Sequence, residues 1–403
     1  MKYLVIGCGP DSMGEAIAAR LLREDGAQVF ITDQNLTNVD ITYGKIKNPS
    51  GTNLKWFLPD GIGLDVIKQK WSLPFYFKNF DMVISGVPAA LNPVIAEAVV
   101  IANERYGERK THYCDLGGVL EITKKMIFGK KPDLARRAAD LGISLVPDCG
   151  LQPGLGNIIA VELLEKFDKK ERLESLIIYV GGLPYNFSDP PYYKKLFNLV
   201  GLAEIYYNSP LVLHKGKPIK IRKFSHYETM SSREFDLCFG STDIVLFEAA
   251  VTGGLGALPC YLKDYVETLQ EKTLRFEGHY KRVKTIPREK FREIFTHWLE
   301  GFPVSEKDFT VMKVVATGTS ALRNKKNAPQ RIKVEKLLYS ESDDRWTSMQ
   351  KTTGFTTAVL AKLIADGRAG PGAFPPEIAL DPKIVLEALK KDFNIYERTT
   401  PLK

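Results

Sequence analysis

A glycine-rich segment near the start of the chain constrains the fold more than any other feature of the sequence. GCGPDSMG, at residues 7–14, follows the short apolar run YLVI and precedes a stretch with apolar residues at helical spacing. An apolar run without alternation is typical of a strand buried on both faces. QVFIT then predicts a second buried strand, which ends in front of Asp33. Strand, glycine turn, helix, strand and acidic residue together predict a dinucleotide-binding βαβ unit.

The glycine turn is longer than the usual G-x-G-x-x-G fingerprint, because two extra residues separate Gly9 from Gly14. Ser12 and Glu15 have the S-x-x-E spacing of a capping box, so the helix is predicted to begin at Met13. A carboxylate beside a diphosphate is repelled. We therefore expect Pro10 and Asp11 to bulge outward, with Asp11 facing solvent.

The acidic residue indicates which nucleotide binds. Asp33 follows Gly14 by nineteen residues, the position from which a carboxylate accepts the hydrogen bonds of an adenosine ribose. Neither Gln34 nor Asn35 supplies a cation for a 2′-phosphate, which favours NAD and leaves NADP as the alternative. The predicted cofactor contacts are Gly7, Gly9, Ser12, Met13, Gly14, Asp33, Ser85, Val87 and Pro88.

The alternation of strands and helices continues through the first part of the chain. NLKWFL, FDMVISGVP, THYCDLGG and ISLVPDCG are predicted strands, and helices are expected from Asn92 to Asn103 and from Pro132 to Gly142. This order predicts an α/β fold with a doubly wound parallel sheet, the Rossmann arrangement. Ligands bind beyond the carboxyl ends of such strands, so residues 85–88, 115–118 and 149–156 are expected to border the site.

From about residue 170 the pattern changes. ESLIIYVGGLP, GKPIKIRKF, FTVMKVVATG and VEKLLY are predicted strands, and single helices are expected around residues 263–271 and 288–299. This predicts a second, α+β domain with a mixed sheet. Helical spacing returns near residue 347. We therefore expect a dinucleotide-binding domain of residues 1–152, completed by C-terminal helices in 345–403, and a substrate-binding and dimerisation domain of 153–344.

Composition excludes several classes of protein. The net charge of +8 comes from scattered lysine pairs without interleaved aromatic residues, which indicates a solvated surface and no nucleic-acid partner. Five cysteines without C-x-x-C spacing point to a reducing cytoplasm, and the histidines show no metal-ligand spacing. No apolar run approaches the roughly 20 residues that span a bilayer, and the N-terminal strand is not a signal peptide. We expect a cytoplasmic protein without a membrane partner or a metal.

Several motifs resemble those of one enzyme family. They are ISGVPAALN, YCDLGG, VPDCGLQPGLGN, YVGGLP, PPYYKKLFNLVGLAEIYY, TLRFEGHY, and TTGFTTAVLAKLIADG with FPPEI. In this order they resemble the saccharopine dehydrogenase-like superfamily, and most closely its lysine 6-dehydrogenase type. The resemblance implies a dinucleotide-binding domain, a substrate domain that also forms homodimer contacts, and NAD(P)-dependent chemistry at an amine carbon of an amino acid.

The chain departs from the saccharopine-reducing branch at three positions. That branch carries a cysteine where Val180 stands, an arginine where Val200 stands, and an acidic residue in place of Gln152. Without the arginine, the distal carboxylate of saccharopine lacks a bidentate partner. Lysine is therefore the favoured substrate.

Oxidising an amine by hydride transfer requires a base for the ammonium proton and anchors for the substrate charges. His279 and Asp115 are the predicted catalytic residues, although an Asx bond that caps the DLGG turn explains Asp115 equally well. Arg275 suits the α-carboxylate. The other predicted substrate contacts are Cys149, Gln152 and Thr252.

Three alternative functions remain open from the sequence. They are a saccharopine-type dehydrogenase with another substrate, a protein that binds NAD without catalysis, and a reductase of a substrate that is not an amine.

Overall fold

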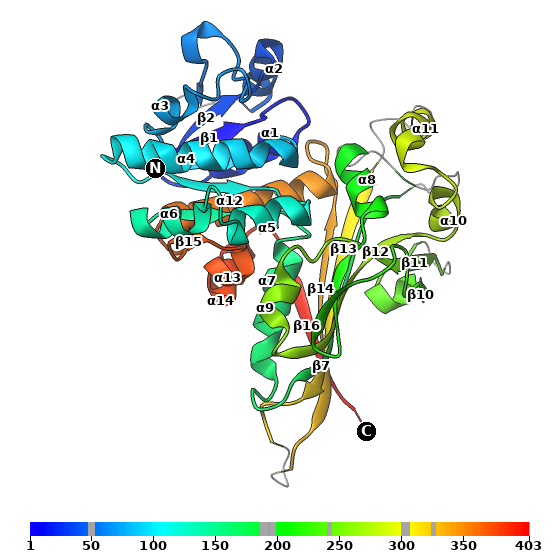
Figure 1. Cartoon of the computed structure of the whole chain (residues 1–403). Helices are drawn as coiled ribbons and strands as arrows, with labels where there is room; N and C mark the ends of the chain where they lie inside the picture. The colour runs from blue at the N-terminus through cyan, green and yellow to red at the C-terminus, as the bar shows by residue number, and fades with distance from the viewer. Residues whose placement is uncertain are drawn as a thin grey trace. The chain divides into compact units, whose positions relative to one another are not determined.

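The computed structural model of the chain describes residues 1–46, 53–185, 193, 199–239, 244–299, 307–323 and 328–402 (Figure 1). The chain divides into two compact units. The first consists of residues 1–155 with 350–389, and the second of residues 156–349 with 390–403.

The first unit contains a seven-stranded sheet in the order β15-β6-β5-β4-β1-β2-β3, and every neighbouring pair is parallel. The order 3-2-1-4-5-6 within it is that of a doubly wound nucleotide-binding sheet. The expected Rossmann fold is therefore confirmed. The strands are β1 (Lys2–Ile6), β2 (Gln28–Thr32), β3 (Leu54–Trp56), β4 (Met82–Ser85), β5 (His112–Asp115), β6 (Ser144–Val146) and β15 (Gly372–Ala373).

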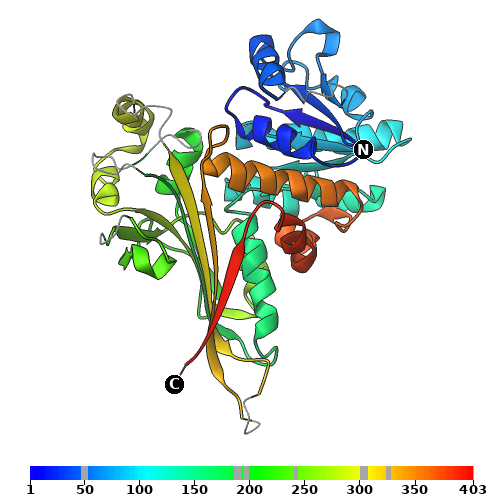
Figure 2. The same ribbon diagram turned by 180° about the vertical axis from the view of Figure 1, so that it is seen from behind.

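Helices cover both faces of this sheet. α1 packs against α2 and α12, and Figure 2 shows α12 running beside α1. α4 packs against α3 and α6 on the other face. A π-helical turn at Gln350–Phe355 leads into α12. The helices are α1 (Met13–Leu21), α2 (Leu36–Ile46), α3 (Leu73–Phe77), α4 (Asn92–Tyr106), α5 (Leu120–Phe128), α6 (Leu134–Leu141), α12 (Thr356–Ala365), α13 (Pro376–Ala379) and α14 (Pro382–Leu389).

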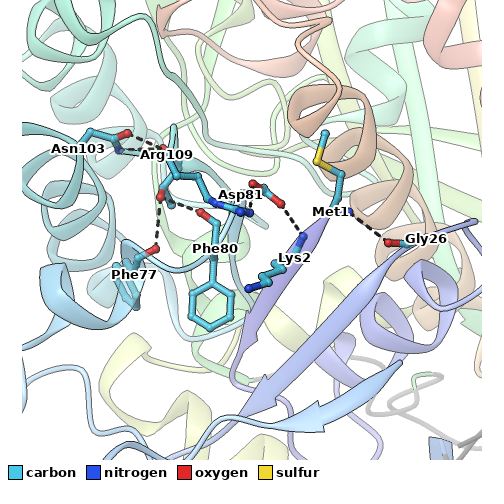
Figure 3. A network of polar contacts seen from close by, with 9 residues as sticks. Met1, Lys2, Gly26, Phe77, Phe80, Asp81, Asn103 and Arg109 are labelled. Atoms are coloured by element: carbon cyan, nitrogen blue, oxygen red, sulfur yellow. Dashed lines mark hydrogen bonds and ion pairs between the residues drawn. The ribbon is translucent and has the colours of Figure 1, made fainter. Parts of the chain in front are cut away.

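Polar contacts join neighbouring strands at the amino edge of the sheet (Figure 3). The Asp81 carboxylate accepts a hydrogen bond of 2.7 Å from the Lys2 amide and one of 2.6 Å from Arg109 Nη1. The Asn103 side chain bonds the backbone of Thr111 in both directions, at 3.0 Å each. These bonds tie the segments that lead into β4 and β5 to β1 and to α4.

The second unit contains a nine-stranded mixed sheet in the order β10-β11-β12-β7-β13-β14-β16, with β8 and β9 off this path. β12 and β7 are parallel, and the other described pairs are antiparallel. The strands are β7 (Leu173–Pro184), β8 (Leu211–His214), β9 (Lys217–Lys220), β10 (Glu228–Ser231), β11 (Leu246–Val251), β12 (Val266–Phe276), β13 (Asp308–Thr319), β14 (Arg331–Glu341) and β16 (Ile395–Pro401). The helices are α7 (Leu155–Leu163), α8 (Leu199–Tyr207), α9 (Leu258–Leu262), α10 (His279–Val283) and α11 (Phe291–Leu299).

Two expectations for the second unit are wrong. Residues 263–271 do not form a helix, because most of this segment belongs to β12, which pairs with β7 on one side and β11 on the other. Val266 and Leu269 are spaced as on a helix, but backbone pairing on both edges fixes the strand. The tail also differs from expectation. Residues 350–389 fold with the first unit, whereas residues 390–403 fold with the second, where β16 pairs with β14.

Other expected elements are present with different lengths. GKPIKIRKF contributes only the four-residue strand β9. The helix expected near residue 288 begins as a 3₁₀ turn at Arg288–Lys290 and continues as α11. Within the described ranges, no helix is both long and apolar enough to cross a membrane.

Candidate functional site

The glycine turn of the first unit brings three backbone segments into close contact. A Cβ atom on Gly14 would lie 2.5 Å from the Gly7 carbonyl oxygen, and one on Gly7 would lie 2.9 Å from Val87 Cγ1. Gly7 also adopts a φ of +81°, which glycine tolerates without strain. The turn therefore has the close packing of a dinucleotide-binding loop in spite of its extra residues.

Asp11, in the lengthened part of the turn, points away from this packed region. Asp11 has a φ of 58° and a side chain that is 78% exposed, with Oδ1 2.8 Å from Lys45 Nζ. Ser12 Oγ accepts the Glu15 amide at 3.1 Å, and the Glu15 carboxylate accepts the Asp11 amide at 2.6 Å. The helix begins at Met13, as the capping pattern predicts. The expected outward position of Asp11 agrees with these contacts.

Asp33 directly follows β2 and lies beside Gly9. Its Oδ1 accepts hydrogen bonds from the Asn35 amide at 3.0 Å and from Asn38 Nδ2 at 3.2 Å. Its Oδ2 lies 3.6 Å from the position that a Cβ atom on Gly9 would occupy. In the described part of the chain, no hydrogen bond reaches Oδ2. One carboxylate oxygen thus holds the loop, and the other is available to a ribose hydroxyl.

Ser85 lies at the end of β4. Its side chain is fully buried, and its hydroxyl donates a 2.7 Å hydrogen bond to Asn92 Oδ1 at the start of α4. The hydroxyl is thus bonded inside the protein, and the predicted contact of Ser85 with a cofactor stays a prediction. The predicted contacts at Val87 and Pro88 stay predictions.

Two buried carboxyl groups lie at the carboxyl ends of β5 and β6. Asp115 Oδ1 accepts the amides of Gly117 at 2.7 Å and Asp148 at 3.2 Å, and Oδ2 accepts the Tyr113 hydroxyl at 2.8 Å. The bond from Gly117 is the Asx turn that the sequence allows as an alternative role for Asp115. Burial raises the pKa of Asp115 to about 6, and the three donors act in the opposite direction.

Asp148 is the neighbour that the sequence reasoning missed. Its Oδ1 accepts the Gly118 amide at 3.2 Å and the Thr123 hydroxyl at 3.0 Å, while its buried Oδ2 has no hydrogen-bond partner among the described residues. Burial and then the charge of Asp115 raise the pKa of Asp148 to about 7. Its position in VPDCG, two residues after a buried strand, was the available signal.

Cys149 and Gln152 follow on the same connection. Cys149 is fully buried, with Sγ 3.3 Å from the Val146 carbonyl oxygen, and burial raises the pKa of its thiol well above the ordinary value. The Thr357 hydroxyl of α12 donates to the Cys149 carbonyl at 2.8 Å. Cys149 therefore packs at the strand end, as expected for a cysteine without a nucleophilic role. The predicted substrate contacts of Cys149 and Gln152 stay predictions.

In the second unit, Arg275 lies on β12 and is only 3% exposed. Its Nε donates to the Tyr206 hydroxyl and its Nη1 to the Leu274 carbonyl, both at 2.7 Å. The guanidinium also lies over the ring of Tyr193, with Cζ 4.9 Å from the centroid. No carboxylate in the described ranges forms an ion pair with Arg275. A buried cation of this kind suits an anionic ligand group.

His279, at the start of α10, is fully buried. Its Nε2 lies 2.9 Å from the Tyr206 hydroxyl, and its ring packs against Tyr193 and Phe295. Tyr206 therefore links His279 to Arg275. This arrangement gives His279 a role in orienting Tyr206, and its predicted role as the base stays a prediction.

Thr252 follows β11 and binds a buried acid that the sequence reasoning did not single out. Its hydroxyl lies 2.6 Å from Glu271 Oε2 and 2.8 Å from the Thr273 hydroxyl. Glu271 also accepts the Gly254 amide at 3.1 Å, and burial raises its pKa. Glu271 falls in the segment 263–271, which was expected to be a helix and forms part of β12. Its burial in the strand could therefore not be predicted. Thr252 as a substrate contact stays a prediction.

The described residues contain no group of histidine, cysteine or acidic side chains arranged to hold a metal ion.

Comparison with known proteins identifies the family. The family model described as the saccharopine dehydrogenase C-terminal domain matches residues 150–393, which is more than half of the chain. The chain belongs to this family. This match confirms the resemblance of the sequence motifs to the saccharopine dehydrogenase-like superfamily. The lysine 6-dehydrogenase type within that superfamily stays a prediction.

Among curated relatives, the chain is 29% identical over 222 residues to the mitochondrial alpha-aminoadipic semialdehyde synthase of Bos taurus. This match covers 54% of the chain and 21% of the relative, so the chain spans about a fifth of that protein's length. It is 22% identical over 296 residues to the saccharopine dehydrogenase [NADP(+), L-glutamate-forming] of Saccharomyces cerevisiae, covering 71% of the chain and 57% of the relative.

Two solved structures share the fold. The apo saccharopine dehydrogenase (L-Glu forming) from Saccharomyces cerevisiae superposes with a TM-score of 0.69 at 16% identity, covering 100% of both chains. The homospermidine synthase from Legionella pneumophila in complex with NAD gives a TM-score of 0.61 at 10% identity, covering 99% of this chain and 91% of that one. The parallel sheet and the mixed sheet therefore form the fold of saccharopine dehydrogenase-like proteins.

Proposed function

We propose that this protein is an NAD(P)-dependent dehydrogenase that acts on an amine carbon of an amino acid. The observation that carries the proposal is the arrangement of Gly9 and Asp33, with Asp33 Oδ2 beside the glycine and Oδ1 fixed by Asn38. An acidic residue in this place recognises the hydroxyls of an adenosine ribose. The close approach of Gly7 to Gly14 leaves the backbone of the turn free of Cβ atoms, as a bound pyrophosphate requires.

The nicotinamide cofactor supplies the hydride acceptor when it is bound. Gly7, Gly9 and Gly14 would hold its diphosphate, and Asp33 its adenosine ribose. The absence of a cation at Gln34 and Asn35 favours NAD. The yeast relative that is named for NADP(+) keeps NADP as the alternative.

The substrate is proposed to be an amino acid with one α-carboxylate and an apolar stem, with lysine as the leading case. Arg275 is assigned to the carboxylate, because it is a buried cation to which no described carboxylate pairs. Val180, which is 7% exposed on β7, offers neither a thiol nor a cation for a second distal carboxylate. The side chain at position 200 lies outside what the structure describes.

The second candidate is a saccharopine-type dehydrogenase, and the names of the relatives favour it. Oxidation of lysine releases ammonia, whereas cleavage of saccharopine releases another amino acid. We therefore propose to incubate the protein with lysine, saccharopine and other amino acids, each with NAD and with NADP, and to follow the absorbance of the reduced cofactor and the release of ammonia. Reduced cofactor with ammonia from lysine supports the first candidate, and turnover of saccharopine alone supports the second. Failure of every amino acid would contradict both and leave a protein that binds NAD without this chemistry.

Two further assignments belong to the same proposal. Cys8, Cys114, Cys149, Cys238 and Cys260 are all free thiols, which supports a reducing compartment such as the cytoplasm. The second unit is proposed to form homodimer contacts.

A further inference from the structure

The carboxyl groups of Asp115 and Asp148 use their oxygens differently, although both residues are 1% exposed. Asp115 accepts three hydrogen bonds spread over both oxygens, so as an anion it is satisfied by the protein. Asp148 accepts two hydrogen bonds at Oδ1, and none from the described residues reaches its buried Oδ2. A buried oxygen left without a partner costs free energy unless a ligand or a water binds it.

The fold directs this pair to the edge of the sheet at which chemistry takes place in nucleotide-binding folds. Asp115 is the last residue of β5, and Asp148 follows β6, the next strand in the sheet. The Asp148 carboxyl lies under the turn at Gly117, where a Cβ atom would stand only 1.7 Å from Oδ1. At Gly118 a Cβ atom would meet nothing within 4 Å, so no other part of the chain packs against the turn on that side.

We propose that Asp148 accepts the proton of the substrate ammonium through its Oδ2 by way of one water, and that Asp115, which accepts the Asp148 amide, is the neighbouring anion that fixes its position. This assignment rests on the proposed function, since it names the base of that reaction. The requirement is geometric, because a base needs a free lone pair on a rigidly held group. The bonds from the Gly118 amide and Thr123 supply the rigidity at Oδ1.

Electrostatics support the division of roles. The pKa of Asp115 lies near 6 and that of Asp148 near 7, because burial raises both and the charge of Asp115 raises the second further. The pair as a whole therefore holds a proton up to neutral pH, and the unpartnered Oδ2 of Asp148 is the oxygen at which that proton can reside. The other ionisable groups near the pair are the Tyr113 hydroxyl and the Cys149 thiol, which contacts that of Cys114. Burial raises the pKa of Tyr113 and of Cys149, so both stay neutral.

The proton and electron balance of the step is complete. One N–H bond of the substrate ammonium breaks, and its proton forms an O–H bond on Asp148. The C–H bond at the carbon that bears this nitrogen then breaks, and hydride carries two electrons to the oxidised nicotinamide. The nitrogen lone pair freed by the first transfer forms the C=N bond.

The first test is the dependence of kcat/KM on pH in the full-length chain with the amino acid that it oxidises. The wild type should show an acid limb with an apparent pKa of about 7. Asp148→Asn should lower kcat/KM by roughly 10²–10⁴-fold and remove this limb. Asp115→Asn should move the limb to lower pH, since it removes the neighbouring charge. Thr123→Val should move it to higher pH, since it removes a donor to the anion. A limb from the substrate's own ammonium group would be common to all variants.

His279→Ala is the matched comparison, because the sequence gives His279 the same role. It should leave the acid limb in place. Loss of the limb in His279→Ala, with its retention in Asp148→Asn, would overturn the proposal. If Asp148→Asn does not fold, the opposite shifts expected for Asp115→Asn and Thr123→Val decide the matter, and unmoved limbs in both would also overturn it.

A second readout separates this inference from the proposed function. Carbon-13 chemical shifts of aspartate carboxyl carbons report protonation without any substrate. One carboxyl that titrates near neutral pH should be missing in Asp148→Asn and should titrate at lower pH in Asp115→Asn. If no amino acid reduces the cofactor but these shifts appear, the proposed function is wrong and the proton-sharing pair stands. If no such carboxyl titrates, the role of Asp148 is wrong whatever the substrate.

Discussion

Asp33 is the residue on which cofactor recognition depends. Asp33→Ala removes the carboxylate whose Oδ2 is free beside Gly9, and it should weaken NAD binding by about 1.5–3 kcal/mol, the value of a charged hydrogen-bonding pair. The preference for NAD over NADP should narrow, because the carboxylate also repels a 2′-phosphate. Titration calorimetry with both nucleotides measures the two effects. Gln34→Ala is the neighbouring control and should change neither affinity. If Asp33→Ala binds NAD and NADP with the same affinities as wild type does, Asp33 does not contact the cofactor.

Asp11 tests whether the lengthened turn is neutral toward the cofactor. Its side chain is 78% exposed and pairs with Lys45, which is itself 42% exposed. A solvent-screened pair of this kind contributes little, so Asp11→Asn should change NAD affinity by less than about 0.5 kcal/mol. The same calorimetric titration checks this. Markedly tighter binding in the variant would instead mean that the carboxylate faces the phosphates.

The candidate site was predictable from the sequence only in part. Gly7, Gly14 and Asp33 follow from a local motif whose spacing determines their roles. Asp148 was missed because its place after a strand is a weak signal by itself, and its contact with Asp115 on the neighbouring strand cannot be read from local sequence. The hydrogen bond between Ser85 and Asn92 was likewise not predictable, because Asn92 lies on the helix that follows.

At the scale of elements, the packing of α1 on the sheet depends on one position without a side chain. A Cβ atom on Gly14 would stand 2.5 Å from the backbone oxygen of Gly7, and neither backbone moves cheaply. Gly14→Ala should therefore displace α1, lower the free energy of unfolding by about 1–3 kcal/mol and weaken NAD binding.

Gly44 in α2 provides the matched control for that change. A Cβ atom there would meet nothing within 4 Å, and the residue is helical. Gly44→Ala should be neutral or stabilising by about 0.4–1 kcal/mol. Thermal and urea unfolding of both variants make the comparison. Equal stability of Gly14→Ala and wild type would contradict the close packing of the turn.

Helices and strands were predictable where the apolar residues follow one clear pattern of spacing. The first-unit strands are short apolar runs that end at turn residues, and their parallel order follows from alternation with helices. β12 was mistaken for a helix because Gln270, Glu271 and Lys272 are three consecutive polar residues, which interrupt the alternation typical of a strand. Glu271 and Arg275 of this strand are polar but buried, whereas the buried face of a half-buried strand usually carries apolar residues.

At the scale of the whole molecule, the chain passes between its two units after residues 155, 349 and 389. The second passage coincides with the return of helical spacing near residue 347, the first precedes the change of sequence pattern near residue 170, and no change of pattern marks the third. β16 joins the second sheet through backbone pairing with β14 and through an ion pair of 3.5 Å between Lys336 on β14 and Glu397. Its exposed and mostly polar residues gave no periodic signal.

The buried pair of acids should make stability depend on pH in a direction opposite to that of most carboxyl groups. The folded pKa values of Asp115 and Asp148 are about 6 and about 7, above the ordinary value of 3.8 that applies when the chain is unfolded. Between these values the folded protein binds more protons than the unfolded chain does. The free energy of unfolding contributed by the pair is therefore fully present at low pH, falls as the pH rises from about 4, and is lost above about 7.

Asp148→Asn isolates this effect, because asparagine has no proton to lose. Relative to wild type, the variant should gain on the order of 2 kcal/mol in the free energy of unfolding between about pH 5 and about pH 8, since each pH unit over which a proton is retained corresponds to about 1.4 kcal/mol. Urea unfolding across this range, followed by the fluorescence of the tryptophans, measures the difference. Asp11→Asn, which alters an exposed carboxylate, should remain parallel to wild type throughout. Parallel curves for Asp148→Asn as well would mean that Asp148 carries no proton in the folded protein near neutral pH, and the assignment of the base would have to return to His279.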